Sequence, residues 1–209
     1  QAGLEGDYAL MDLPPDRLVG AVMVFRHTLR GFNCTIPYKQ AILPLLDDLS
    51  PEARRYGAVN TVVIRNGRLV GHNTDAAGFR TALAQAGLSP AGRTVLVLGA
   101  GGVARVLAAV AAEGGAARVV ILHRDPEKAT SLARDLSLVT GHDGISAAAA
   151  GAAFAETEDE ARRLGADPRD ALLLNGTPVG MWPDTGGLPV GDALLPSLSG
   201  VYDTIYNPL

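Results

Sequence analysis

The residues best suited to chemistry in this chain form a glycine-rich turn with the pattern G-x-G-x-x-A. Its members are Gly99, Ala100, Gly101, Gly102, Val103 and Ala104. The turn follows an aliphatic run, residues 94–98, and opens a helical pattern, residues 103–112. Such glycines make a tight turn and let a pyrophosphate approach the backbone, where the helix N-terminus offers free N–H groups. The turn predicts a dinucleotide site, against the alternative of a packing turn without a ligand.

The next expected strand ends at His123, Arg124 and Asp125, where the adenosine ribose of a dinucleotide lies. The Arg124 guanidinium suits the extra 2′-phosphate of NADP, and His123 either flanks the adenine or adds positive charge. Asp125 leaves NAD open, because an acid at this point accepts a bond from the ribose 2′-OH. Asp125 followed by Pro126 is also a common helix start. The pattern favours NADP, and the chain has no phosphate-binding loop of the ATPase type.

A second polar group precedes the glycine turn and consists of Thr35, Lys39, Asn60 and Asp75. Each lies at or just beyond the end of an expected strand, where α/β sheets bind ligands. A half-buried lysine beside a carboxylate can pass a proton to a developing alkoxide, and amide and carboxylate groups hold the hydroxyls of a polyol. Residue types alone leave two plainer roles open: Lys39 as a surface lysine, and Asp75 as a helix cap.

The elements that must position these residues follow from apolar periodicity and from turn residues. Asn66-Gly67 predicts a hairpin between residues 61–64 and 69–72. Residues 8–13 are a short apolar run. Residues 144–155 have no clear assignment, and a strand or a mobile loop in part of this stretch are both open. The other expected helices are 17–29, 38–48 (with Pro44 shortening it), 75–86, 103–112 and 126–136, and the other strands are 32–36, 94–98, 118–122, 172–174 and 201–205. The β-α-β-α order after residue 93 predicts a doubly wound parallel sheet.

Composition narrows the function classes. Of the 209 residues, 47% are hydrophobic and 19% are charged, so the chain can form a core. A net charge of -4 with interspersed signs predicts neither a nucleic-acid partner nor a membrane partner. The single cysteine, Cys34, excludes an internal disulfide and a cysteine-based zinc site, and we expect packing as its role. We expect a cytoplasmic globular protein without a bound metal.

Six motifs occur in order along most of the chain. They are GFNCTIPYK (residues 31–39), GAVNT (57–61), GHNTD (71–75), GAGGVA (99–104), NGTPVGM (175–181) and YDTIYNP (202–208). This series resembles the signatures of the shikimate dehydrogenase family, and six in sequence are far more specific than any one of them. The resemblance implies reversible, NADP-dependent reduction of 3-dehydroshikimate to shikimate, a step of aromatic amino-acid (chorismate) biosynthesis.

The resemblance also implies roles for individual residues. Lys39 matches the family's catalytic lysine, and Asp75 matches the acid that works with it. Thr35, Asn60 and Tyr206 match substrate-binding residues. Asn175, Thr177 and Ile205 match positions on the cofactor side, with residues 175–181 lining the nicotinamide end. Arg124 matches the arginine of the family's Asn-Arg-Thr nucleotide motif, from which His123 and Asp125 depart.

The motif order implies an N-terminal α/β substrate domain, residues 1–88, followed by a Rossmann-type NADP domain, residues 89–209, joined near Ser89. The family's N-terminal serine loop and C-terminal helices are not found in the sequence, so we expect both domains to be incomplete and the chain to be part of a longer protein. A naturally shortened protein is the alternative. Two other functions stay open: an NAD-dependent quinate/shikimate dehydrogenase, and a non-catalytic nucleotide-binding homologue. A monomer or a homodimer is expected.

Overall fold

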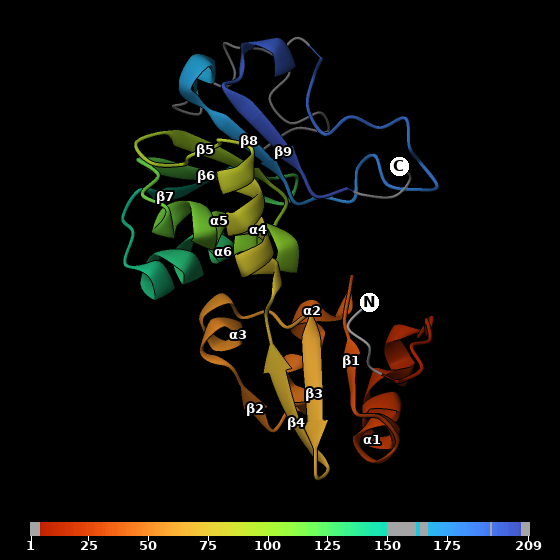
Figure 1. Ribbon diagram of the computed structural model, residues 1–209. Coiled ribbons are helices and arrows are strands. Elements are labelled where there is room, and N and C mark those ends of the chain that lie inside the picture. The colour runs from red at the N-terminus through yellow and green to blue at the C-terminus, as the bar shows by residue number, and fades with distance from the viewer. Residues whose placement is uncertain (1–4, 150–161, 164–166, 193, 206–209) are drawn as a thin grey trace.

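A computed structural model describes residues 5–149, 162–163, 167–192 and 194–205. Two lobes, each built on its own sheet, lie one above the other in Figure 1. The α/β class expected from the sequence is confirmed. Within the described residues, no helix is long and apolar enough to cross a membrane.

The first lobe contains a four-stranded sheet in the order β1-β3-β4-β2. The strands β3 and β4 form the expected hairpin, and both turn residues have positive φ, 51° at Asn66 and 73° at Gly67. The strand β1 pairs antiparallel with β3, and β2 pairs parallel with β4. The elements of this lobe are η1 (Pro15–Arg17), α1 (Leu18–Thr28), β1 (Gly31–Asn33), α2 (Tyr38–Ala41), η2 (Leu43–Leu45), β2 (Asp48–Leu49), α3 (Pro51–Tyr56), β3 (Thr61–Arg65) and β4 (Arg68–His72).

The structure of this lobe differs from the expectations at two places. The helix expected at residues 38–48 is interrupted after α2, because Pro44 has no N–H for a helical bond, and β2 replaces its end. The helix α3 was not expected, although its signals are local: Ser50 accepts a bond from the Ala53 N–H, Pro51 is its first residue, and Gly57 ends it with a φ of 58°. The apolar run at residues 8–13 forms neither helix nor strand.

The second lobe contains a parallel sheet in the order β7-β6-β5-β8-β9, as expected for a doubly wound fold. The strand β7, in a stretch to which the sequence assigns no clear structure, pairs with β6 at one edge. The remaining elements are α4 (Asp75–Gln85), β5 (Thr94–Leu98), α5 (Gly102–Glu113), β6 (Arg118–His123), α6 (Pro126–Thr140), β7 (Ile145–Ala149), η3 (Pro168–Asp170), β8 (Leu172–Asn175), η4 (Leu195–Ser197) and β9 (Gly200–Asp203).

The core of the second lobe explains why its central strands are aliphatic throughout. Alternate residues of β5 face opposite sides of the sheet: Val95 and Val97 pack among α4, α5 and α6, whereas Leu96 and Leu98 pack against the chain around Val190. All four side chains are fully buried. A strand covered on both faces must be apolar at every position, as the run at residues 94–98 predicts.

The helix α4 packs with the second lobe, although it precedes the expected junction near Ser89. Its residue Phe79 lies in the core of that lobe, with its ring centroid 4.8 Å from that of Tyr202 on β9. The chain therefore passes from one lobe to the other just before α4 (Figure 1). The division into residues 1–88 and 89–209 stays a prediction.

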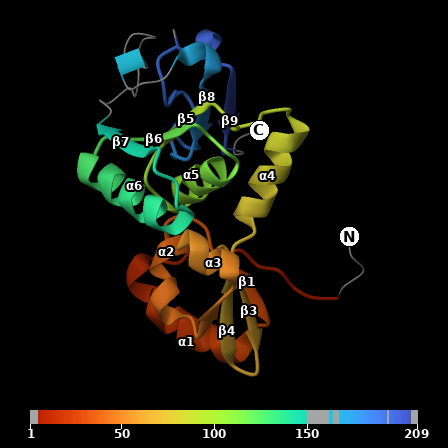
Figure 2. The same ribbon diagram turned by 90° about the vertical axis from the view of Figure 1, so that its left-hand side faces the viewer.

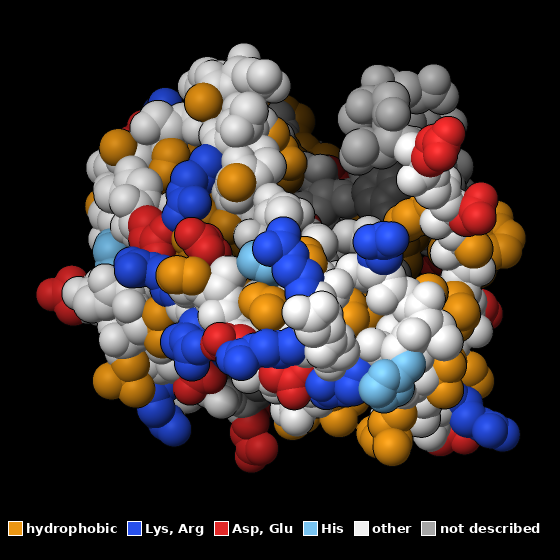
Figure 3. Space-filling view, turned by 60° about the horizontal axis from the view of Figure 1, so that its bottom comes forward, with side chains coloured by type: hydrophobic (Ala, Val, Ile, Leu, Met, Phe, Trp, Pro, Cys, Tyr) orange, Lys and Arg blue, Asp and Glu red, His pale blue; other side chains and the backbone are white. Residues whose placement is uncertain are grey.

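The two lobes meet along α5. Figure 2 shows α2 and α3 at the end of the first lobe that faces α5 and α6. The N-terminal residue of α5, Gly102, lies against Lys39 of α2. At its other end, about 17 Å away along the axis, Glu113 bonds to Arg55 and Tyr56 of α3. On the molecular face in Figure 3, acidic and basic side chains are interspersed.

Candidate active site

The glycine turn joins β5 to α5 in the geometry that its sequence predicts. Gly99 has a φ of 101°, a conformation that favours glycine, and a side chain there would lie 3.1 Å from the carbonyl oxygen of Gly176. A Cβ on Gly101 would meet no atom within 4 Å, so the space before the helix is open. None of the described side chains caps the N-terminus of α5. Its free N–H groups and partial positive charge are therefore available to an anion.

Ala104, the last residue of the motif, packs against the loop that follows β8. It is fully buried, and a Cβ added to Gly176 would lie 2.8 Å from its Cα. Small residues at both positions let the helix and the loop approach each other closely. Ala104 is not among the residues that line the cavity described below, so its assignment to the cofactor stays a prediction.

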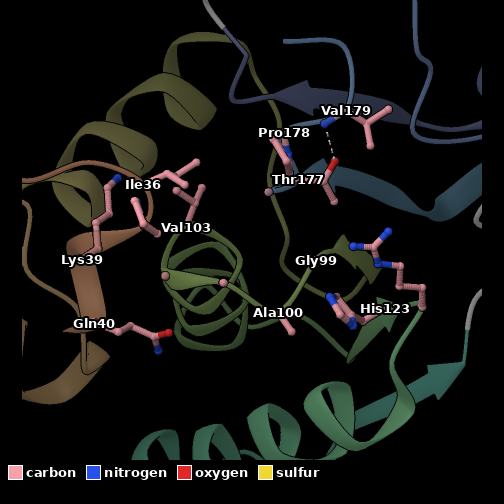
Figure 4. Close-up of a pocket in the computed structure, with 15 residues that line it drawn as sticks. Ile36, Lys39, Gln40, Gly99, Ala100, Val103, His123, Thr177, Pro178 and Val179 are labelled. Atoms are coloured by element: carbon pink, nitrogen blue, oxygen red, sulfur yellow. Dashed lines mark hydrogen bonds between the residues drawn. The ribbon is translucent and has the colours of Figure 1, made fainter. Parts of the chain in front are cut away.

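Asn175 shapes the loop after β8 from a buried position. Its Oδ1 atom accepts bonds from the backbone N–H of Thr177 (3.0 Å) and from the Thr177 hydroxyl (2.7 Å), and its Nδ2 atom donates to Asp203 (3.0 Å). Thr177 accepts in turn from the N–H of Val179, the dashed line in Figure 4. Thr177 lines the cavity, whereas Asn175 and Ile205 do not. Tyr206 lies outside the described residues.

A cavity of about 400 Å³ lies between the glycine turn and the first lobe (Figure 4). We call it the interlobe cavity. One wall belongs to the second lobe and the other to the loop and helix after β1. Its lining residues are Ile36, Pro37, Lys39, Gln40, Gly99, Ala100, Gly101, Gly102, Val103, His123, Arg124, Gly176, Thr177, Pro178 and Val179.

The cavity brings most of the predicted cofactor residues together with Lys39. Gln40, Ile36 and Pro37 were missed as lining residues, although they flank Lys39 in the motif at residues 31–39. Only their position beside Lys39 could have indicated that they line the cavity, since neither an isoleucine nor a proline by itself indicates ligand binding. Among the described residues, no cluster of three or more histidine, cysteine or acidic side chains is arranged to hold a metal ion.

Lys39, Asp75 and Asn60 form one hydrogen-bonded chain. The Lys39 Nζ atom lies 2.7 Å from Asp75 Oδ2, and Asn60 Nδ2 donates to Asp75 Oδ1 at 2.7 Å. The Lys39 side chain is only 14% exposed, and that of Asp75 is 31% exposed. The ammonium group is thus held by a charge-assisted bond at a fixed point beside the cavity.

The helix-cap role of Asp75 is excluded by its contacts. The N-terminus of α4 is capped by Asn73, whose Oδ1 atom accepts from the N–H of Ala76 at 3.2 Å. Both oxygens of Asp75 are engaged by residues of the first lobe instead. Asp75 therefore links the start of α4 to Lys39 and Asn60.

Thr35 and Cys34 precede Lys39 in the same segment but do not line the interlobe cavity. Thr35 has an exposed side chain, and its carbonyl accepts from the N–H of Tyr38 at 2.7 Å, which closes the turn into α2. Cys34 is buried, and this burial raises the pKa of its thiol to about 11. The positive charge of Lys39 acts in the opposite direction but is the smaller effect. A neutral, buried thiol is a packing group, in agreement with its expected role.

His123 and Arg124 line the opposite end of the cavity, whereas Asp125 does not. The carboxylate of Asp125 caps α6, where Oδ1 accepts from the N–H groups of Glu127 (3.0 Å) and Lys128 (3.3 Å). The backbone N–H of Lys128, followed by that of Glu127, holds the pKa of Asp125 below its ordinary value. The helix-start role of the Asp125-Pro126 pair is therefore confirmed.

Comparisons with known proteins agree with this arrangement. The family described as "Shikimate dehydrogenase substrate binding domain" matches residues 1–62, and "Shikimate / quinate 5-dehydrogenase" matches residues 82–146. A shikimate dehydrogenase (NADP(+)) from Symbiobacterium thermophilum is 43% identical over 99% of this chain and 68% of its own length. The corresponding protein from one strain of Thermus thermophilus is 41% identical over 99% of this chain and 70% of its own length.

Two solved structures extend the comparison. Shikimate 5-dehydrogenase from another strain of Thermus thermophilus, in complex with NADP(H) and shikimate, superimposes with a TM-score of 0.78 at 38% identity, over 99% of this chain and 70% of that chain. A ligand-free 5-ketofructose reductase from a Gluconobacter strain has a TM-score of 0.72 at 37% identity, over 95% of this chain and 68% of that chain. The chain spans about two thirds of the length of these relatives.

Proposed function

This chain belongs to the shikimate dehydrogenase family, and on that premise we propose that it catalyses the reversible, NADP-dependent reduction of 3-dehydroshikimate to shikimate in aromatic amino-acid biosynthesis. The observation that carries the proposal is the position of the Lys39 ammonium group. It lies against Asp75 at the edge of a cavity whose other wall is a dinucleotide-binding glycine turn.

The residues of the second lobe fit NADP. Gly101 leaves open space in front of an uncapped helix N-terminus, as a pyrophosphate requires. Arg124 at the end of β6 provides a guanidinium for a 2′-phosphate, and Asp125, which would repel that phosphate, is occupied as a helix cap. When bound, the cofactor supplies the hydride for reduction of the ketone carbon.

We propose Lys39 and Asp75 as the catalytic residues. The ammonium group of Lys39 donates a proton to the ketone oxygen as that oxygen gains negative charge, and it takes the proton back in the reverse reaction. Asp75 keeps the Lys39 ammonium group in place through the 2.7 Å contact. Asn60 holds the other oxygen of Asp75 in turn, so that the carboxylate cannot rotate away.

The other assignments are proposals on the same premise. Thr35, Asn60 and Tyr206 bind the substrate hydroxyls. Thr177, with Asn175 behind it, forms the nicotinamide side of the site, and Ile205 and Ala104 complete the cofactor set. The protein acts in the cytoplasm, as a monomer or a homodimer. Light scattering on the purified protein distinguishes these two oligomeric states.

The test is an initial-rate assay of shikimate oxidation with NADP. Quinate replaces shikimate and NAD replaces NADP in parallel assays. In the reducing direction, 5-ketofructose is a further alternative substrate, because the 5-ketofructose reductase shares the fold. Lys39→Ala is expected to lower kcat by about 10²–10⁴-fold, the usual contribution of a positioned proton donor. Lys128→Ala is the matched control, since Lys128 is the only other lysine in the chain and its side chain is 69% exposed.

The results separate the alternatives. A higher kcat/KM with NAD and quinate supports the quinate/shikimate alternative, and preference for 5-ketofructose contradicts the proposed substrate. Nucleotide binding without turnover of any of these substrates supports the non-catalytic homologue. Wild-type turnover by Lys39→Ala contradicts the role of Lys39.

A further inference from the structure

Arg105 directly follows the glycine turn on α5, and its side chain spans three elements. The Nη2 atom donates to Asp135 Oδ2 on α6 at 2.7 Å. The Nη1 atom would lie 3.6 Å from a Cβ on Gly57, the residue that ends α3. The guanidinium therefore occupies the junction at which α3 of the first lobe meets α5 and α6 of the second (Figure 2).

Stability alone does not account for an arginine at this place. Its side chain is only 15% exposed, and its Nε atom is buried without a bond to any described residue. A buried donor without an acceptor destabilises a fold, whereas an apolar side chain of the same length would not. The useful property of the arginine is therefore its reach, which joins Asp135 on α6 to the first lobe.

Gly57 begins a short segment that contacts both proposed catalytic residues. The segment ends at Asn60, and we call it the site segment. The N–H of Val59 donates to the carbonyl oxygen of Lys39 at 2.8 Å. Asn60 Nδ2 donates to Asp75 Oδ1 at 2.7 Å. A shift of the site segment relative to α5 therefore moves both proposed catalytic residues together.

The site segment packs directly on Arg105. Gly57 has a φ of 58°, which favours glycine, and the three atoms nearest to a Cβ at this position all belong to Arg105. The next two residues, Ala58 and Val59, are fully buried. Because a close-packed interior transmits displacements, the position of the guanidinium fixes the position of the segment.

The helix α5 meets the first lobe along one side. Near its N-terminus Gly102 lies against Lys39, and at its far end Glu113 bonds to residues of α3. Arg105 lies between these contacts, three residues after Gly102 and eight before Glu113. This spacing places all three on the same side of the helix. Arg105 is therefore in a position to set how closely the first lobe approaches the glycine turn.

We propose that Arg105 is a positioning residue for the reaction: held by Asp135, it fixes the site segment on α5 and so sets the distance between Lys39 and the glycine turn. The inference rests on the proposed function, which assigns the proton transfer to Lys39. Arg105 does not line the interlobe cavity, so it acts through Gly57 and touches no ligand there.

The first test compares Arg105→Met with Arg134→Met in the oxidation of shikimate with NADP. Methionine keeps an unbranched side chain and removes the guanidinium. Arg134, an exposed residue of α6 next to Asp135, is the matched control. Loss of the guanidinium is expected to displace Lys39 by about half an ångström, which corresponds to about tenfold in kcat. The Kd for NADP, measured by calorimetry, is expected to stay unchanged, because Arg105 is not a lining residue of the cavity.

Asp135→Asn keeps the arginine and removes only its charged partner. That carboxylate is 47% exposed, so the ion pair constrains Arg105 weakly and kcat is expected to fall by about threefold. Wild-type kcat in folded Arg105→Met overturns the proposal, and so does a fall in kcat that an equal loss of NADP affinity accompanies. If Arg105→Met does not fold, wild-type kcat in Asp135→Asn overturns it instead.

Nuclear magnetic resonance gives a measurement that does not depend on turnover. The chain has two lysines, so selective labelling of lysine distinguishes Lys39 from Lys128. The nuclear Overhauser effect between Lys39 and Gly102, which lie against each other, is expected to weaken in Arg105→Met and to persist in Arg134→Met. An unchanged effect in Arg105→Met overturns the proposal. A weakened effect in a protein whose wild type does not oxidise shikimate refutes the proposed function and supports the positioning of Lys39 by Arg105.

Discussion

Replacing Gly102 with alanine is expected to slow catalysis without destabilising the protein. A Cβ at this position would lie 3.2 Å from Lys39 Cβ and 3.8 Å from both Lys39 Cδ and Gln40 Cγ. The first of these distances is shorter than ordinary carbon–carbon contact, so Lys39 must retreat by several tenths of an ångström. Alanine itself is unstrained, because Gly102 does not adopt the left-handed conformation.

The size of the effect follows from the geometry. A displacement of about 1 Å at a reacting group costs roughly 10²-fold in rate, so a shift of about half that size corresponds to about tenfold in kcat. Helix propensity favours alanine over glycine by up to about 1 kcal/mol, which offsets the crowding. The thermal midpoint of Gly102→Ala should therefore stay within about 3 °C of the wild type.

Two other glycines provide controls in the same assay. Gly78→Ala, on the exposed part of α4 with open space around its Cβ, should raise stability and leave kcat unchanged. Gly101→Ala also meets no protein atom, but it fills the space before the helix, so it should raise KM for NADP more than it lowers kcat. Wild-type kcat in a folded Gly102→Ala protein would refute the reasoning that this glycine positions Lys39.

Three further predictions concern stability and reactivity. Glu113→Gln leaves the arginines at the junction of α3, α4 and α5 without their carboxylate, so urea unfolding should show a loss of about 1–3 kcal/mol; an unchanged midpoint would contradict a structural role for this cluster. Burial raises the pKa of the Cys34 thiol to about 11, so at pH 8 the native protein should react with iodoacetamide about a hundredfold more slowly than the urea-unfolded chain. Equal rates would show that the thiol is accessible and ionised in the native protein. The hydrogen bond from Arg26 lowers the pKa of Asp47, so this pair stabilises the folded protein fully above about pH 5. The stabilisation declines as the pH falls through the ordinary aspartate pKa near 4, and it disappears below the lowered pKa of the folded protein. The free energy of unfolding, measured with urea, should accordingly fall less between pH 5 and pH 2 in Asp47→Asn than in the wild type. An equal fall in both proteins would rule out this contribution.

Elements with local signals could be predicted from the sequence. The hairpin at Asn66-Gly67 and the strand–turn–helix around Gly99 depend on conformations set within a few residues. The helix α3 could also have been found from Ser50, Pro51 and Gly57. The edge strand β7 could not, because its alanine-rich sequence has no strong preference and pairing with β6 decides its structure.

The sequence by itself determined which residues are candidates for the site. The glycine turn, Lys39, Asp75 and the basic pair at the end of β6 were all predicted from residue type, spacing and motif order. Only the tertiary structure decided between the roles that those types allow. Two aspartates each precede or begin a helix, yet Asp125 caps its helix whereas Asp75 reaches across to Lys39, which is 36 residues away in sequence. A cap depends on N–H groups two or three residues along the chain, so its signal is local. An ion pair between lobes depends on how two cores pack against each other, and no short stretch of sequence encodes that.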